Sequence, residues 1–304
     1  MMSLFAGFLT NDLFCSKPLS GNCHMSTWKW VCVFFLFFFF LIGGIAWYVN
    51  ILTATENAIG RRDIAELRGI LIDTPERAFE KDFYGFSMMH LAAQHNFPEG
   101  IAMLAEAGAM INATYTLTEK ELESHKDLAR SNDERPDYVV WDYQSIEGMT
   151  PLHFAVIFHA HKAVNELIRL GADVNLCDSK RQSPLYWAAR CWNSEAISVL
   201  ASSGSDIHAE TIIGGFTPLH AVFDSFPEHP NIGMGSGFTR DLRIIYYPLS
   251  SSPREARKKT VEALLKAGAN HLYPALHGDT PLDVCPPDEI SLHFGHLFTA
   301  EKAH

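Results

Sequence analysis

Fifteen histidines and six cysteines are the side chains of this sequence best suited to metal binding or catalysis. His159 and His161 lie two residues apart in an expected turn, and His293 and His296 lie three apart on an expected helix. Either pair supplies only two of the four ligands that a structural zinc ion takes, and no third ligand stands at a suitable spacing. We predict no metal site and no cofactor, with metal binding by either pair as the alternative.

The cysteines do not form a recognisable framework. Three stand before or within an apolar N-terminal segment and three follow it, and an odd number does not make a disulfide framework. A single Cys177–Cys191 bridge is the alternative if this part of the chain lies outside the cytoplasm. The six are Cys15, Cys23, Cys32, Cys177, Cys191 and Cys285.

Motifs of the common enzyme classes are absent from the sequence. It contains no Gly-x-Ser-x-Gly, no phosphate-binding loop, no dinucleotide fingerprint and no paired-carboxylate motif. We therefore predict no catalytic residue and no small-molecule substrate. Beyond residue 50 the chain has 34 acidic and 22 basic residues, a net charge near −12, which argues against nucleic-acid binding.

The most informative feature is a short phrase that recurs five times. Its copies start at residues 87, 150, 183, 217 and 280, so they are separated by 63, 33, 34 and 63 residues. A second, glycine-containing phrase follows each of the first four copies, with Gly108, Gly171, Gly204 and Gly268 at its centre. The five copies read Ser87-Met88-Met89-His90, Thr150-Pro151-Leu152-His153, Ser183-Pro184-Leu185-Tyr186, Thr217-Pro218-Leu219-His220 and Thr280-Pro281-Leu282-Asp283.

Each residue type in the phrase has a backbone role. Thr150 can cap a helix, Pro151 suits its first position, and Gly171 suits the left-handed residue that ends the following helix. Two of the four spacings equal the ankyrin period of about 33 residues, and the other two equal that period plus about 30. The sequence resembles the ankyrin repeat family. The resemblance implies that His90 and His153, with His220, make structural hydrogen bonds within the scaffold.

The resemblance implies an all-α ankyrin-repeat solenoid of about five to six helix-turn-helix repeats over residues 53–304. Residues 53–84 are expected to form a degenerate first repeat, and 280–300 a closing cap. Two insertions of about 30 residues are expected at about 114–147 and 226–257. The third repeat departs from the family because Arg181 and Gln182 replace its glycine-containing turn.

An uncharged segment precedes the repeats. Residues 30–49 hold twenty residues without a charge, long enough at about 1.5 Å per residue to span roughly 30 Å of hydrocarbon. We predict a single transmembrane anchor at 28–50 after an N-terminal tail at 1–27, with translation starting at Met25. A cleaved signal peptide and a buried helix are the alternatives. The repeats are predicted to lie outside the cytoplasm, in the periplasm of a bacterial envelope.

The resemblance also implies where a partner protein binds, namely at the hairpin tips and the exposed positions of the first helices. Apolar residues occupy many of these usually polar positions, which is typical of a protein contact surface. The alternative is that the insertions fold back and cover them. The candidate partner-binding residues are Phe83, Tyr84, Phe86, Ile146, Met149, Ile157, Phe158, Arg190 and Phe216.

We therefore expect a membrane-anchored, non-catalytic scaffold that binds another protein. The layout is similar to bacterial envelope ankyrin proteins, and that resemblance implies an immunity-type role in neutralising a secreted antibacterial toxin. An accessory or assembly factor for an envelope enzyme, such as an oxidative-defence catalase, is the alternative function. An enzyme whose site lies within the two insertions is a third.

Overall fold

The computed structural model describes residues 54–82, 85–116, 146–223 and 253–285. The chain divides into two compact units, Met1–Ile51 and Leu52–His304, and the first lies wholly outside the described residues. The predicted tail, start at Met25 and membrane anchor at 28–50 fall in that unit. Within the described ranges, no helix has both the length and the apolar character needed to cross a membrane.

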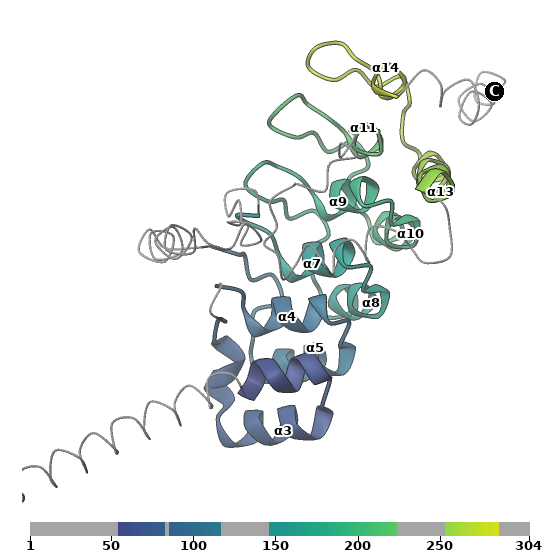
Figure 1. The fold of residues 1–304 in the computed structure, drawn as a ribbon. Helices are drawn as coiled ribbons and strands as arrows, with labels where there is room; N and C mark the ends of the chain where they lie inside the picture. The colour runs from purple at the N-terminus through teal and green to yellow at the C-terminus, as the bar shows by residue number, and fades with distance from the viewer. Residues whose placement is uncertain (1–53, 83–84, 117–145, 224–252, 286–304) are drawn as a thin grey trace, which may run out of the picture. The chain divides into compact units, whose positions relative to one another are not determined.

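The described part of the second unit is helical, in agreement with the all-α prediction (Figure 1). Its described residues contain no strand, and one isolated bridge joins Lys81 to Ser87. The elements, after a helix at 54–61, are α3 (Ile64–Asp73), the 3-10 helix η1 (Pro75–Phe79), α4 (Met88–Gln94), α5 (Pro98–Glu106), α7 (Pro151–Ile157), α8 (His161–Arg169), α9 (Pro184–Arg190), α10 (Ser194–Ser202), α11 (Pro218–Ala221), α13 (Pro253–Lys266) and α14 (Pro281–Val284).

The recurring phrase starts a helix at each of its five copies. The hydroxyls of Ser87 and Ser183 accept hydrogen bonds from backbone N–H groups at the third residue of α4 and α9. Thr150, Thr217 and Thr280 each form a capping box with the residue three positions on. These bonds satisfy N–H groups that have no partner within the helix, so the start of each helix is encoded locally.

The helix pairs stack on their neighbours in two rows. In one row α4 contacts α7, α7 contacts α9, and α9 contacts α11; in the other α5 contacts α8, α8 contacts α10, and α10 contacts α13 (Figure 1). Small residues such as Ala92, Ala155 and Ala188 are fully buried between helices of the first row. Leu167 and Leu200 are fully buried in the second, where each such side chain stabilises the fold by roughly 1.5–3 kcal/mol.

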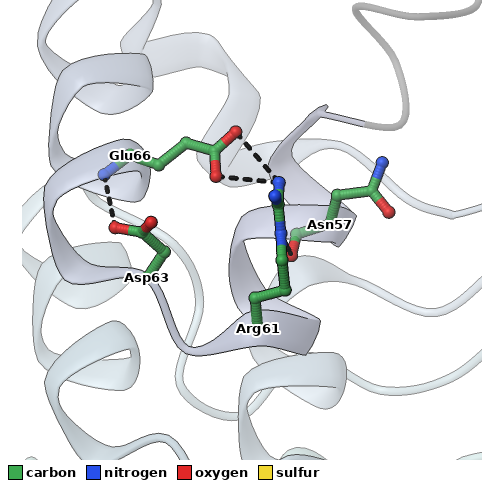
Figure 2. A network of polar contacts seen from close by, with 4 residues as sticks. All are labelled: Asn57, Arg61, Asp63 and Glu66. Carbon is green, nitrogen blue, oxygen red and sulfur yellow. Dashed lines mark hydrogen bonds and ion pairs between the residues drawn. The ribbon is translucent and has the colours of Figure 1, made fainter.

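A polar network closes the turn of the first helix pair (Figure 2). Asp63 caps α3 by accepting a hydrogen bond from the backbone N–H of Glu66 at 2.9 Å. The guanidinium of Arg61 donates to the carboxylate of Glu66 at 2.9 and 3.2 Å and to the carbonyl of Asn57 at 3.2 Å. Arg61 is 65% exposed, so the ion pair contributes at most about 1 kcal/mol.

The described residues include both ends of the first insertion and the last residues of the second. The N–H of Tyr115 donates to the carbonyl of Met149 at 2.7 Å, and the N–H of Gly148 donates to the carbonyl of Tyr115 at 2.8 Å, so the ends of the first insertion are held together. In the second, residues 253–257 already belong to α13, although the sequence placed them in the insertion. Pro253 suits the first turn of that helix, because its missing donor is not needed there. Residues 117–145 and 224–252 lie outside the described ranges.

Candidate functional site

Four of the predicted partner-binding residues are buried, so the prediction that they are exposed is wrong for them. Phe86 and Ile146 are each 2% exposed, Met149 is fully buried, and Ile157 is 4% exposed. Tyr115, from the base of the first insertion, covers Phe86 with its ring centroid 4.6 Å away. Ile157 ends α7, which is packed between α4 and α9.

Three other predicted residues are partly exposed, and their role in partner binding stays a prediction. Phe158 stacks on Phe154 with ring centroids 6.2 Å apart. The guanidinium carbon of Arg190 lies 5.4 Å from the centroid of the Trp187 ring, and the ring of Phe216 lies 5.5 Å from that of His220. The remaining two, Phe83 and Tyr84, lie outside the described residues.

The phrase histidines connect consecutive repeats, as the resemblance implied. The Nδ1 atom of His153 accepts a hydrogen bond from the backbone N–H of Thr150 at 3.1 Å. Its Nε2 atom must therefore carry the proton and donate to the carbonyl of Gln182, 3.1 Å away in the next repeat. His90 and His220 make the same contacts to the carbonyls of Met149 and Asp279, each at 3.1 Å.

Burial keeps these histidines neutral. Desolvation lowers the pKa of His90 and His153 to about 4, against an upward effect of their hydrogen bonds to backbone carbonyls. The pKa of His220 is also lowered, again mainly by burial. These rings act as structural bridges. The Nδ1 atoms of His90, His153 and His220 also lie within hydrogen-bond distance of the hydroxyls of their own cap residues, at 2.7 Å for Ser87, 2.9 Å for Thr150 and 2.8 Å for Thr217.

The pair His159 and His161 does not form a metal site with other side chains. The rings of His159 and His161 lie 6.1 Å apart, and the Nε2 atom of His161 is 3.4 Å from a carboxylate oxygen of Glu195. Burial lowers the pKa of His159 to about 4. Among the described residues, no three His, Cys, Asp or Glu side chains are placed to hold a metal ion.

None of the described cysteines, Cys177, Cys191 and Cys285, is in a disulfide bond. Cys177 and Cys191 are not linked, so the alternative of a bridge between them is wrong. Burial, followed by the charge of Asp178, raises the pKa of Cys177, which makes this thiol less nucleophilic at neutral pH.

Backbone hydrogen bonds join the successive hairpin tips. The N–H of Ser179 donates to the carbonyl of Glu147 at 2.9 Å, and the N–H of Ile212 donates to the carbonyl of Lys180 at 3.1 Å. The N–H of Leu276 donates to the carbonyl of Gly214 at 2.9 Å. The tips are therefore fixed relative to one another by main-chain contacts that depend little on side-chain identity.

Apolar side chains project from two of these joined tips. Ile212 is 55% exposed, Ile213 is 75% exposed and Leu276 is 68% exposed. We call these three residues the tip patch. None of the three is among the residues predicted to bind a partner. Ile213 occupies a tip position of the repeat, and this position was the signal in the sequence that could have identified it. Exposed apolar residues held on a rigid backbone are suited to contact with another protein.

A polar groove of about 310 Å³ lies beside the tip patch, between the third and fourth hairpins. Its carboxylates already have partners: Asp206 accepts a hydrogen bond from the N–H of His208 at 2.9 Å, and Glu210 accepts one from the hydroxyl of Tyr273 at 2.7 Å. The lining residues are Asn175, Cys177, Arg181, Ser183, Asp206, His208, Ala209 and Glu210.

Side chains also bridge the hairpins beneath the tips. Asn112 accepts a hydrogen bond from the backbone N–H of Asp173 at 3.0 Å, and Asn175 accepts one from that of Asp206 at 2.8 Å. His208 occupies the corresponding position of the next repeat, and its Nε2 atom accepts from the N–H of Asn270 at 3.2 Å. These bonds stiffen the loops that form the groove.

Comparisons with known proteins agree with this geometry. Residues 122–211 match the profile described as ankyrin repeats in three copies. The chain is also similar to the RelA-associated inhibitor of Mus musculus, with 37% identity over 73 residues, which is 24% of this chain and 9% of that protein. The matched segment thus covers a small part of this relative. With the capped helix pairs and the histidine bridges, these matches identify ankyrin repeats in this chain.

Proposed function

We propose that this chain is a non-catalytic scaffold that binds another protein through the tip patch and the adjoining groove. Ankyrin repeats form a protein–protein interaction module. The single observation that carries the choice of surface is the exposure of Ile212, Ile213 and Leu276 on two hairpins joined by a backbone hydrogen bond. A rigid apolar surface next to polar residues loses little conformational entropy when a partner covers it.

The test uses charged substitutions at matched exposed isoleucines in the full-length chain. Ile213→Asp alters the tip patch, whereas Ile72→Asp alters α3 at a residue that is 73% exposed. Both variants are cross-linked in the native cells, and the captured proteins are identified by mass spectrometry. We expect a partner that is captured with the parent chain and with Ile72→Asp but is lost with Ile213→Asp. Equal capture by all three chains would place the interface elsewhere.

We further propose that residues 28–50 anchor the chain in a membrane with the repeats on the extracytoplasmic side. The support is the run of twenty uncharged residues at 30–49, which matches the thickness of the hydrocarbon layer. An alkaline phosphatase fused to the C-terminus of the full chain should be active, because this enzyme requires an oxidising compartment. An inactive fusion of the same abundance would place the repeats in the cytoplasm.

The finer proposal is an immunity-type role, in which the scaffold neutralises a secreted antibacterial toxin. It is supported by the combination of a predicted anchor and a protein-binding repeat domain without catalytic motifs. Cells that lack the chain should be killed by a toxin-secreting neighbour, and the parent chain but not Ile213→Asp should restore survival. If survival is unchanged and an envelope catalase loses activity instead, the alternative role as an accessory factor is favoured.

A further inference from the structure

The third hairpin tip has an arginine where the other tips have glycine. Two residues before each copy of the phrase, Gly85, Gly148, Gly215 and Gly278 have φ angles of 88°, 81°, 63° and 88°. Arg181 stands at this position in the third copy, with a φ of 57°. The left-handed conformation is strained for any residue with a Cβ atom, so glycine would adopt it at lower cost.

A second position of the repeat also has left-handed residues, but there they occur in several repeats, so they do not single out one residue as Arg181 is singled out at the tips. Non-glycine residues with positive φ also occur at the turn between the two helices of a repeat. That turn recurs with the repeat period, so its strain belongs to the scaffold. Arg181 is instead the exception at its own position among the described tips. The residues at the helix–helix turn are Arg62, Asn96, His159 and Trp192, with φ from 50° to 55°.

The surroundings of Arg181 leave its charge available to a ligand. It lines the groove, whose carboxylates Asp206 and Glu210 accept hydrogen bonds from other groups. Within the described ranges, neither Arg181 nor the neighbouring Lys180 forms an ion pair. The carbonyl of Lys180 accepts the N–H of Ile212, so the backbone that carries Lys180 and Arg181 is joined directly to the tip patch.

We propose that Arg181 anchors a carboxylate of the partner protein, on a segment that places Asp or Glu next to an aliphatic side chain. The guanidinium would bind the carboxylate through two parallel hydrogen bonds, and the aliphatic group would cover the tip patch. Lys180 adds a second positive charge for the same carboxylate. A strained backbone at a position where glycine would be relaxed supports a function for the side chain. This inference rests on the proposed protein-binding function and specifies the chemistry of its partner.

The experiment selects a random-sequence peptide library, displayed on phage, against the full-length chain. Recovered peptides should be enriched in an acidic residue adjacent to Leu, Ile or Val. Synthetic copies should bind Arg181→Gly roughly tenfold or more weakly than the parent, because charged hydrogen bonds are lost. Replacing the acidic residue of the peptide by its amide should weaken binding to the parent chain to a similar extent.

Arg62→Gly is the matched control. Arg62 has the same side chain and nearly the same φ, 55°, but lies at the helix–helix turn of the first repeat. Both glycine variants should unfold at a temperature no lower than that of the parent, since both relieve left-handed strain. Only Arg181→Gly should lose the acidic peptides. A lower unfolding temperature for Arg181→Gly would mean that the arginine is kept for folding, and would overturn the proposal.

The remaining outcomes separate this proposal from the proposed function. Two results would overturn the role of Arg181: recovered peptides that lack an acidic residue, or peptides that bind Arg181→Gly as tightly as the parent. If Ile213→Asp still abolishes binding in either case, the proposed protein-binding function stands. Failure to recover any peptide would overturn recognition of a short acidic segment. The protein-binding function would then be decided by the cross-linking comparison of Ile213→Asp with Ile72→Asp.

Discussion

Acidification should destabilise the repeat stack through its buried histidine bridges. The pKa values of His90 and His153 are lowered from 6.5 to about 4, so between these values the unfolded chain binds protons that the folded chain does not. Stability is therefore fully present above pH 6.5 and is lost as pH falls toward 4. From pH 7 to pH 5, linkage gives a loss of about 2 kcal/mol for each histidine.

His153→Gln isolates one of these contributions. A glutamine amide can still donate to the carbonyl of Gln182 but cannot titrate, whereas the N–H of Thr150 loses its acceptor. We expect the variant to be less stable than the parent at pH 7 by about 1–3 kcal/mol. Between pH 7 and pH 5 it should lose about 2 kcal/mol less than the parent does, because one titrating group has been removed.

The measurement is urea unfolding of the full chain at pH 7, 6 and 5, followed by far-ultraviolet circular dichroism. Hydrogen exchange of α7 and α9 at each pH tests whether the loss is local to the His153 bridge, since repeat stacks can open in parts. If the parent and His153→Gln show the same dependence on pH, protonation of His153 does not limit stability, and our account of the bridge is wrong.

Two further predictions concern the third hairpin and its neighbour. Asp178→Asn should destabilise the fold by about 1–3 kcal/mol. The Oδ2 atom of Asp178 accepts a hydrogen bond from the indole N–H of Trp187 at 3.0 Å, and an amide nitrogen at that place cannot accept one. An unchanged midpoint of urea unfolding would contradict this prediction. Gly148→Ala should cost more stability than Gly171→Ala. Both residues have positive φ, but a Cβ atom at 148 would lie 2.8 Å from the backbone N of Ser179, whereas one at 171 meets nothing within 4 Å. Equal thermal shifts for the two variants would refute the steric argument.

The residues of the phrase predicted the helix starts, and the resemblance to ankyrin repeats implied the structural role of the phrase histidines. Capping depends on residues within one turn of each other, so Thr150, Pro151 and His153 specify their helix without reference to the rest of the chain. The carbonyls that accept the bridges belong to residues of different types, Met149, Gln182 and Asp279, which share only their place directly before the next copy of the phrase.

Whether the predicted partner-binding residues are exposed depends on tertiary contacts that cannot be read from the repeat pattern. Phe86 and Met149 occupy positions that are often open in a repeat. Tyr115, at the start of the first insertion, covers Phe86 with its ring and donates a backbone hydrogen bond to Met149. The residues next to Phe86 in the sequence do not predict that it is covered. The prediction of exposure therefore failed where an insertion interrupts the period.

What the sequence by itself determined is thus the repeating unit, its capped helices and its bridging histidines, because these follow from local chemistry repeated at a fixed spacing. Only the tertiary structure decided which apolar groups remain exposed and showed that Arg181 keeps the left-handed conformation of a glycine. Exposure is decided between hairpins that are about 33 residues or more apart, by backbone hydrogen bonds and steric contact. The conformation of Arg181 is instead held within its own turn, where its N–H donates to the carbonyl of Asp178 at 3.0 Å.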